Sequence, residues 1–576
     1  MSPTDSFASF PAQVWEKVLS KVKKAVVFMD EPCSESLHWS AGGAARLFGA
    51  GARNVKRFSS FEAGADDEPK AVFVVSTLLK GRTADVIKDI ISLSRFQYCV
   101  VFTAVPHSLH LASGSSSSSS AESEGSPVFA RFEEKLCEWM GDMNYTAEVA
   151  YAPVAFARLS PQLLLAPAFA DLFPLLESDL QSVNEKRPEK RRFLSVADVD
   201  AAALPVELQV KMKAFASALD ALLEFSSVRE ESFAVGPLSR LLAAELASHP
   251  QAKNRRKTAQ NKASVVFIDR TLDLTGAVGH HGDNLVEKIL SVLPPLPGHV
   301  TDVQVDMWEL THLRRTSEVQ GVLAPGCLAQ NQSATARLLW EAMLVAKQKE
   351  AVMEVRRQLV EAASKENLPI KMSLGRVTAE QLSSYVQLFR GSWGAVESHC
   401  GVLQLGLATA HTLRHPALTH WDACLAFERL LLQALGDSGL PDVLKQLLHL
   451  VKSSGSDTGV DPGSGDLSVD ELLVLLVYVY SLAQETKSRS HDEDQVEKLE
   501  AELVGALTLL LTQQTTLSPL LRDITGGAMI NHDAHVVPQR RVHRTTPLEQ
   551  IACQCKTSLE YCGISLPAAG TKGMFK

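Results

Sequence analysis

Three charged side chains follow an apolar run near the middle of the chain. Val265–Ile268 is apolar throughout, which predicts a buried strand, and it leads directly into Asp269 and Arg270 and then Asp273. Phosphoryl-transferring hydrolases place a nucleophilic aspartate after a strand, but they need a second acid two residues later, where this chain has Thr271. A structural turn explains the pattern better: Asp269 accepts backbone N–H bonds, and Arg270 pairs with Asp273 or another acid.

The histidines after this turn raise the question of a metal site. His280 and His281 can bind metals, but adjacent histidines point in different directions, and no ligand follows at the four-residue spacing of H-E-x-x-H. Asp283 or Asn284 is better explained as the N-cap of the next helix. We expect no metal and no cofactor here. A hydrolase or phosphatase built on Asp269, Asp273, His280 and Asp283 is kept as the alternative to a binding function.

Composition and charge narrow the classes of function. The chain has 576 residues, 45% hydrophobic and 21% charged, which is ordinary globular usage and enough for several domains. Its net charge of −9 gives no indication of nucleic-acid binding. The basic runs Lys21–Lys24, Lys186–Arg192 and Lys253–Lys257 are expected to be solvated faces or loops.

Neither a secretory leader nor a membrane span is predicted. The chain starts without the apolar core of a signal peptide, and no window approaches about 18 uncharged apolar residues. The nine cysteines are scattered along the chain, which predicts reduced and mostly buried thiols. We expect a cytoplasmic protein that reaches membranes only through partners.

The first 112 residues alternate strands and helices. Ala25–Met29, Ala71–Val75 and Tyr98–Ala104 are continuous apolar runs, with a helix expected over Thr83–Ser94. Continuous apolar strands separated by helices predict a parallel sheet covered on both faces. Residues 113–127, rich in serine, are expected to be a low-complexity linker.

Residues 128–290 continue a mixed pattern, and residues 291–525 are dominated by helical signals. We expect a polar basic loop over Gln251–Lys262 before the strand of the charged turn. Ser333 is expected to cap one long helix that runs through Ala363. Thr378 with Gln381 forms a capping box. Ser398 is a weaker cap candidate for a helix over 400–413.

One apolar stripe in the helical part has two interpretations. Leu382, Tyr385, Val386 and Phe389 follow the i, i+3, i+4, i+7 spacing of a single helical face. Such a face is either part of a core or an anchor that docks against a partner helix. The spacing alone leaves both open.

A strand that ends in Asp-Arg, followed by Asp, an apolar turn, His and a helix, resembles the most recognisable segment of the SM (Sec/Munc, Sec-one-like) proteins, which bind SNAREs in vesicle fusion. The resemblance covers roughly residues 15–524. It implies an α/β fold plus an all-α insert, in which two parallel-sheet α/β domains and a large helical domain form an arch. The implied division is 1–112, 113–127 (linker), 128–290 (first half of the second α/β domain), 291–525 (helical insert) and 526–576 (atypical tail).

The resemblance also implies where a partner binds. Gln381–His399 occupies the position of the helical hairpin that contacts the SNARE bundle in SM proteins, with Arg390 and Gly391 where the family often has a proline hinge. The partner-binding residues implied are Leu382, Tyr385, Val386, Phe389, Trp393 and Val396. Asp269, Arg270 and Asp273 would be a structural motif.

The end of the chain departs from the family pattern. Thr516–Ile524 looks like the segment after the helical insert, but the strands that complete the second α/β domain are expected to be missing. Such a sheet would expose an edge. The tail contains Cys553, Cys555, Cys562 and His543, a spacing that fits structural zinc poorly, so we expect disorder instead.

The resemblance implies a non-enzymatic protein that binds SNARE or syntaxin-type helices in vesicle docking and fusion. Tethering-complex subunits are a second class of partner. Peripheral association with endoplasmic reticulum, Golgi or vesicle membranes, through partners, is expected.

Overall fold

The computed structural model describes most of the chain in two compact units. The described residues are 3–114, 128–172, 180, 183–185, 187–280, 282–313, 321–329, 333–371, 375–437, 439–454, 469–482 and 490–513. Unit 1 contains Met1–Phe173, Asp200–Phe267 and Asp283–His415. Unit 2 contains Pro174–Val199, Ile268–Gly282 and Pro416–Lys576. The predicted five-part division into domains stays a prediction.

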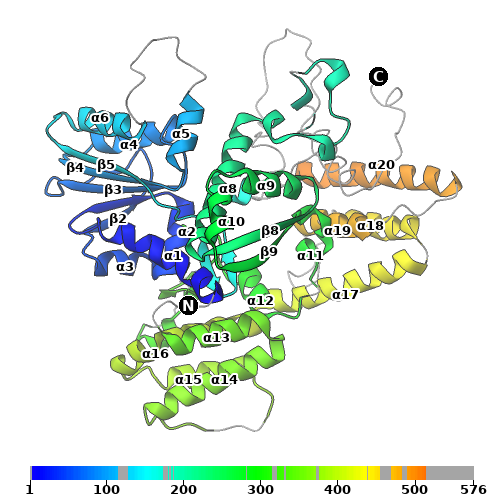
Figure 1. Ribbon diagram of the computed structural model, residues 1–576. Coiled ribbons are helices and arrows are strands. Elements are labelled where there is room, and N and C mark those ends of the chain that lie inside the picture. Colours follow the sequence, from blue (N-terminus) through cyan, green and yellow to red (C-terminus); the bar gives the residue numbers. More distant parts are fainter. Residues whose placement is uncertain are drawn as a thin grey trace, which may run out of the picture. The chain divides into compact units, whose positions relative to one another are not determined.

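A five-stranded parallel sheet forms the first part of unit 1, in the order β2-β1-β3-β4-β5 (Figure 1). Its strands are β1 Val26–Met29, β2 Asn54–Arg57, β3 Lys70–Val75, β4 Tyr98–Thr103 and β5 Thr146–Tyr151. The three apolar runs are its central strands, and successive residues alternate between two separate buried clusters. The predicted parallel sheet with two covered faces is confirmed.

Helices cover both faces of this sheet (Figure 1). One face packs against α1 Pro3–Leu19, α2 Glu31–Ala41 and α3 Gly43–Gly49; the other packs against α4 Arg82–Ser92 and α6 Val128–Met140. Helix α5 spans His107–Gly114.

Asp30 shows how a strand end fixes the next element. Its carboxylate accepts the backbone N–H of Cys33, which caps α2, and it also accepts bonds from the backbone N and Oγ of Ser76. Gly42 then ends α2 at φ 89°, a left-handed conformation that favours glycine.

A smaller layer of unit 1 contains a two-stranded sheet of β8 Val228–Val235 and β9 Asn261–Ile268. It carries α8 Val206–Phe225, α9 Pro237–Ser248 and α10 Ala252–Thr258. Unit 1 also contains the short elements β6 Ala157–Ser160, β7 Leu163–Leu165, η1 Pro167–Leu172 and η4 Ala201–Ala203. The 3₁₀ turns η2 Glu189–Arg191 and η3 Val196–Asp198 lie between η1 and η4 in the sequence but belong to unit 2.

Two predictions about this layer are wrong. The run Val265–Ile268 is not a buried strand, because its residues alternate: Val265 and Phe267 pack inward, whereas Val266 is 55% and Ile268 65% exposed. The expected polar loop over Gln251–Lys262 is instead helix α10 and the start of β9. An apolar run does not specify how many of its faces the rest of the chain covers.

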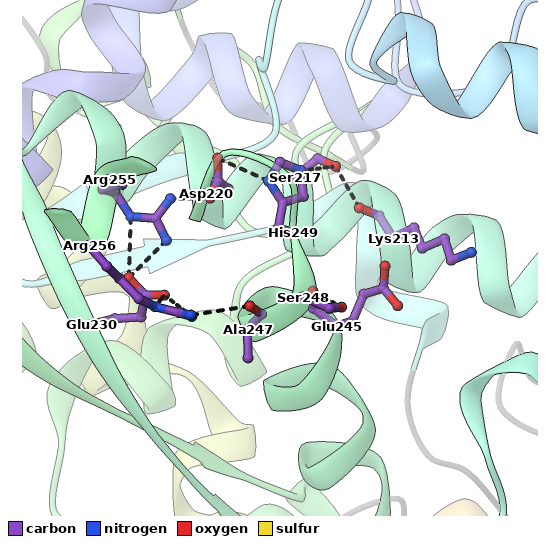
Figure 2. A network of polar contacts seen from close by, with 10 residues as sticks. All are labelled: Lys213, Ser217, Asp220, Glu230, Glu245, Ala247, Ser248, His249, Arg255 and Arg256. Atoms are coloured by element: carbon purple, nitrogen blue, oxygen red, sulfur yellow. Dashed lines mark hydrogen bonds and ion pairs between the residues drawn. The ribbon is translucent and has the colours of Figure 1, made fainter. Parts of the chain in front are cut away.

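A buried ionic network connects Arg255 of this basic run to α8 and β8 (Figure 2). Arg255 is 1% exposed, and its guanidinium contacts the carboxylates of Asp220 on α8 and Glu230 on β8, with an Nη2–Oε2 distance of 2.8 Å to Glu230. Arg256 Nη2 lies 2.7 Å from the other carboxylate oxygen of Glu230, Oε1. His249 Nδ1 lies 3.2 Å from Asp220 Oδ2. Lys253 and Lys257 are exposed, as expected of a solvated face, but the prediction is wrong for Arg255, whose buried charge is compensated by two acids 25 and 35 residues away.

The remainder of unit 1 is a helical layer. It contains α12 Leu285–Val292, α13 Ala334–Val345, α14 Gln348–Lys365, α15 Ala379–Gln387 and α16 Trp393–Arg414, with η6 Trp308–Leu310 and the short strands β10 Val305–Asp306 and β11 Pro325–Gly326. The caps Ser333, Asn284 and the Thr378–Gln381 capping box are confirmed.

Two expectations about these helices are wrong. The helix expected from Ser333 to Ala363 is broken after Val345, where Ala346 and Lys347 are extended and Lys347 forms an isolated bridge with Asn284. Ser398 caps nothing, because α16 begins five residues earlier, and its hydroxyl donates to the carbonyl of Gly394 inside the helix.

Unit 2 is helical in its described residues. It contains η5 Arg270–Leu272, α11 Leu274–Val278, α17 Pro416–Asp437, α18 Leu440–Ser454, α19 Val469–Leu482 and α20 Ser490–Gln513. Its core includes Leu444, Leu447, Val479 and Leu503, and Val278 packs against it. Thr516–Ile524 and the tail with its cysteines lie outside the described residues.

We predict that Arg255→Met destabilises the chain by about 3–5 kcal/mol, because Asp220 and Glu230 would lose their shared buried cation and keep only Arg256 and His249 as neighbours. Urea unfolding followed by circular dichroism measures this as a lower midpoint. Lys257→Met on the exposed side of the same helix is the matched control, with an expected change within about 0.5 kcal/mol. Equal midpoints for the two variants would show that the network does not stabilise the fold.

Candidate partner-binding site

The predicted hairpin exists, but its apolar stripe faces inward. Leu382, Tyr385, Val386 and Phe389 are at most 4% exposed and belong to the large core cluster of unit 1. Helix α15, the turn and α16 form a folded hairpin whose α15 packs on both α14 and α16. The described conformation therefore supports the interpretation that these four residues are part of the core.

Close helix packing accounts for this burial. A Cβ atom added to Gly406 on α16 would lie 3.0 Å from both methyl carbons of Leu359 on α14, so α14 and α16 are in tight contact and a larger residue at position 406 would require Leu359 to shift by a few tenths of an ångström. The stripe on α15 then fills the space beside the crossing. A sequence pattern contains no information about this third helix.

The turn and the start of α16 are the parts of the hairpin that reach the surface. Trp393 is 79% exposed, whereas Val396 is half-buried and packs against the core. Arg390 and Gly391 are exposed in the turn. Gly391 has no left-handed φ, and a Cβ atom there would contact nothing, so the described turn does not require glycine. Among the predicted contact residues, Trp393 is the one that presents a large apolar surface.

A buried carboxylate holds the hairpin in place. Glu309 in η6 accepts a bond from Arg414 Nη2 at 2.7 Å, lies 3.5 Å from His411, and also contacts Ser383 and Gln387 of α15. Burial alone would raise its pKa, but the bonds and charges of His411 and Arg414 outweigh burial and lower the pKa of Glu309 to about 2. Glu309 therefore ties both helices of the hairpin to η6.

A second set of buried acids joins α2 to residues 300–303, 328 and 329. Asp302 accepts His38 Nε2 at 2.7 Å and the backbone N–H groups of Val303, Leu328 and Ala329. Glu35 in the same way accepts the backbone N–H of Val300 and the hydroxyl of Thr301. Sequence reasoning missed these residues and Glu309, because their partners are up to 266 positions away.

One donor set in this joint resembles a metal site. His38, Asp302 and Cys327 offer ligand atoms that all lie within 4.8 Å of one another. However, both oxygens of Asp302 already accept hydrogen bonds. Burial, and then the charge of Asp302, raises the pKa of the Cys327 thiol to about 12, and the thiol Sγ lies 3.8 Å from the carbonyl oxygen of Ala329. Hydrogen bonding explains the cluster.

The structural motif around Asp269 is only partly as predicted. Asp269 is buried, as expected for a turn acid, but Arg270 is exposed and no ion pair joins it to Asp273 among the described contacts. Asp273 instead caps α11 by accepting the backbone N–H of Gly276 at 2.7 Å. Each of these acids has a structural place in a turn.

His280 also has a structural partner. Both its backbone N–H and its Nδ1 bond the buried Glu428, the ring pair at 2.6 Å, and its ring packs against Trp421. These contacts lie within unit 2. His281 lies outside the described residues.

Comparison with known proteins places this fold in a family. A scan against protein-family models found no match. The chain is 54% identical over 524 residues to Sec1 family domain-containing protein 2 of Mus musculus and 53% identical over 523 residues to that of Homo sapiens, in each case over 90% of this chain and 75% of the relative. It is 22% identical to Sec1 family domain-containing protein MIP3 of Arabidopsis thaliana, over 81% of this chain and 67% of that protein.

A solved structure shows the same fold. The SM protein Vps45 in complex with the Qa SNARE Tlg2 is 12% identical, with a TM-score of 0.51 over 88% of this chain and 76% of that one. The fold is thus that of the Sec1-like proteins. The chain belongs to the Sec1 (SM) family of SNARE-binding vesicle-trafficking proteins, a family of regulators, and is similar to the Sec1 family domain-containing protein 2 members of it.

We predict that Glu309→Gln lowers stability most at neutral pH. A pKa lowered from 4.5 to about 2 corresponds to about 3 kcal/mol of stabilisation above pH 4.5, and this contribution is lost as pH falls from about 4.5 to about 2. Urea midpoints measured from pH 7 downwards should therefore converge for wild type and variant in acid. Glu397→Gln, at an exposed position of α16, should show no such trend; a constant gap for Glu309→Gln would contradict the ionic role.

Proposed function

We propose that this chain is a non-enzymatic SM-type regulator that binds SNARE or syntaxin-type helices in vesicle docking and fusion. The observation that carries the proposal is the identity of more than half of the aligned residues, over 90% of the chain, to Sec1 family members. The Sec1-like fold is shared with Vps45, whose structure was solved with a Qa SNARE bound. Asp273 caps helix α11 and His280 bonds Glu428, so both side chains have structural roles that require no catalysis.

The physical mechanism that we propose is templating. A SNARE segment that is disordered on its own has to be ordered when it binds, and this ordering opposes association. A surface that is already rigid adds little ordering cost of its own. The hairpin of α15 and α16 meets this requirement, since its stripe is packed in the core and Glu309 fixes both helices.

Trp393 is the contact that we assign to the partner. Large aromatic side chains dominate the energetics of protein interfaces, and Trp393 stands on a helix whose following turns are buried. Tether subunits would use the same surface and are an outcome of the test.

Any membrane association is proposed to depend on the partner. Within the part of the chain that the structure describes, no helix is both long and apolar enough to span a membrane.

We predict that the purified chain binds the cytoplasmic region of at least one Qa SNARE in a panel tested by isothermal titration calorimetry. Trp393→Ala should weaken that binding by about 2 kcal/mol, or roughly thirtyfold, the range of an interface hot spot. A charged residue at Leu382 or Phe389 would disrupt the core, so Trp393 is the position that tests a surface role.

Phe61→Ala is the matched control, because Phe61 is also highly exposed and aromatic but lies in the loop after β2. Equal losses for the two variants would rule out a specific role of Trp393. If no Qa SNARE binds and tether subunits do, the partner class proposed here is wrong.

A further inference from the structure

A small cavity of unit 1 combines an aromatic wall with two arginines, Arg158 and Arg337, that form no ion pair with any residue the structure describes. It has a volume of ≈ 260 Å³ and lies where α2, β6 and α13 meet. The rings of Trp39 and Trp340 stack in its wall with centroids 5.5 Å apart. Trp39 Nε1 donates to Thr301 Oγ1 and Trp340 Nε1 to the carbonyl of Leu159, both at 2.8 Å, so the wall is fixed before anything binds.

Three arginines and two glutamates line the same cavity. Arg46 is compensated, because its Nη2 lies 2.8 Å from Oε1 of Glu16. Arg158 and Arg337 have no ion pair within the described part of the chain, and Glu341 is the remaining acid of the lining. Three positive and two negative charges leave the lining with an excess of one positive charge.

Arg158 is the arginine of this lining whose charge an anion would stabilise most. Its backbone N–H donates to Ser40 Oγ at 2.9 Å, which fixes its place on β6, and its side chain is half-buried. Burial and then the charge of Arg337 lower the pKa of the Arg158 guanidinium, while Glu341 partly opposes them. Arg337 is exposed, so the repulsion is unfavourable chiefly for the half-buried Arg158, and an oxyanion bound beside both guanidinium groups would relieve it.

The size of the cavity limits what can enter. It lies below the roughly 300–1,000 Å³ of pockets for cofactors and drug-sized ligands. It holds several times the roughly 30 Å³ of one water molecule. A single side chain with an anionic end fits this range.

We propose that this cavity, the Trp39–Arg158 pocket, binds an anionic side chain of the partner protein, either a carboxylate or a phosphate group. The oxygens would bond the guanidinium groups of Arg158 and Arg337, and the stem would lie against the indole wall. The identity of the partner rests on the proposed function, whereas the anion chemistry does not.

The test uses the full chain and simple probes. Inorganic phosphate and three short peptides, identical except for a central Ser, Glu or phosphoserine, are titrated while tryptophan fluorescence and the thermal midpoint are recorded. We expect saturable binding of phosphate and of at least one anionic peptide, and none of the Ser peptide. Tighter binding of the phosphoserine peptide assigns a phosphorylated partner; equal or tighter binding of the Glu peptide assigns an acidic one.

The double variant Arg158→Gln, Arg337→Gln should weaken this binding about tenfold or more, since charge-assisted pairs are lost. Arg95→Gln, which removes an exposed arginine on another surface, is the control and should bind like wild type. Circular dichroism checks that both variants are folded. Absence of saturable binding, or binding retained by the folded double variant, overturns the pocket.

The two proposals fail separately. Loss of peptide binding in the double variant without any Qa SNARE binding to wild type would keep the pocket and remove the proposed function. SNARE binding by a chain that binds none of the anionic probes would do the reverse.

Discussion

The ion pairs of Arg255 are the interaction on which the smaller layer of unit 1 depends. That layer has a two-stranded sheet, and its buried apolar side chains include Leu223, Val228 and Leu246 of one cluster, with further buried residues on α8 and α9. Apolar packing is non-directional, so it specifies the relative positions of the elements less precisely than bonds of fixed geometry do. A guanidinium bonded to acids on α8 and β8 has a fixed geometry, so it sets where α10 and both partners lie.

Buried carboxylates serve the same purpose elsewhere in unit 1. Asp302 and Glu35 join α2 to residues 300–303, 328 and 329, and Glu309 joins η6 to both helices of the hairpin. Each acid accepts several hydrogen bonds, which compensates the cost of its burial. Connections of this kind link elements that are distant in sequence and allow few alternative arrangements. Rigidity at the hairpin is then a property of the polar groups as much as of the apolar core.

The sequence predicted the features that depend on local chemistry. The strands of the parallel sheet were found because they are apolar without interruption, and Thr378–Gln381 because a capping box needs only four residues. The burial of Arg255 could not be predicted, since it depends on acids of two other elements. The prediction that β9 is buried on both faces failed for the converse reason. Val266 and Ile268 are apolar, yet no described element covers them well enough to bury them.

The burial of the hairpin stripe means that a partner has to contact other residues of the hairpin. A spacing of i, i+3, i+4 and i+7 shows that one face is apolar but not whether another helix of the same chain already covers it. Because α14 and α16 cover it here, these four residues give the hairpin its rigidity instead of its contacts. A rigid support is what a protruding side chain such as Trp393 needs, since a partner then loses little free energy to ordering the surface it meets. Under the proposed function, core and interface are therefore coupled, because the buried stripe holds rigid the helix that carries the proposed anchor.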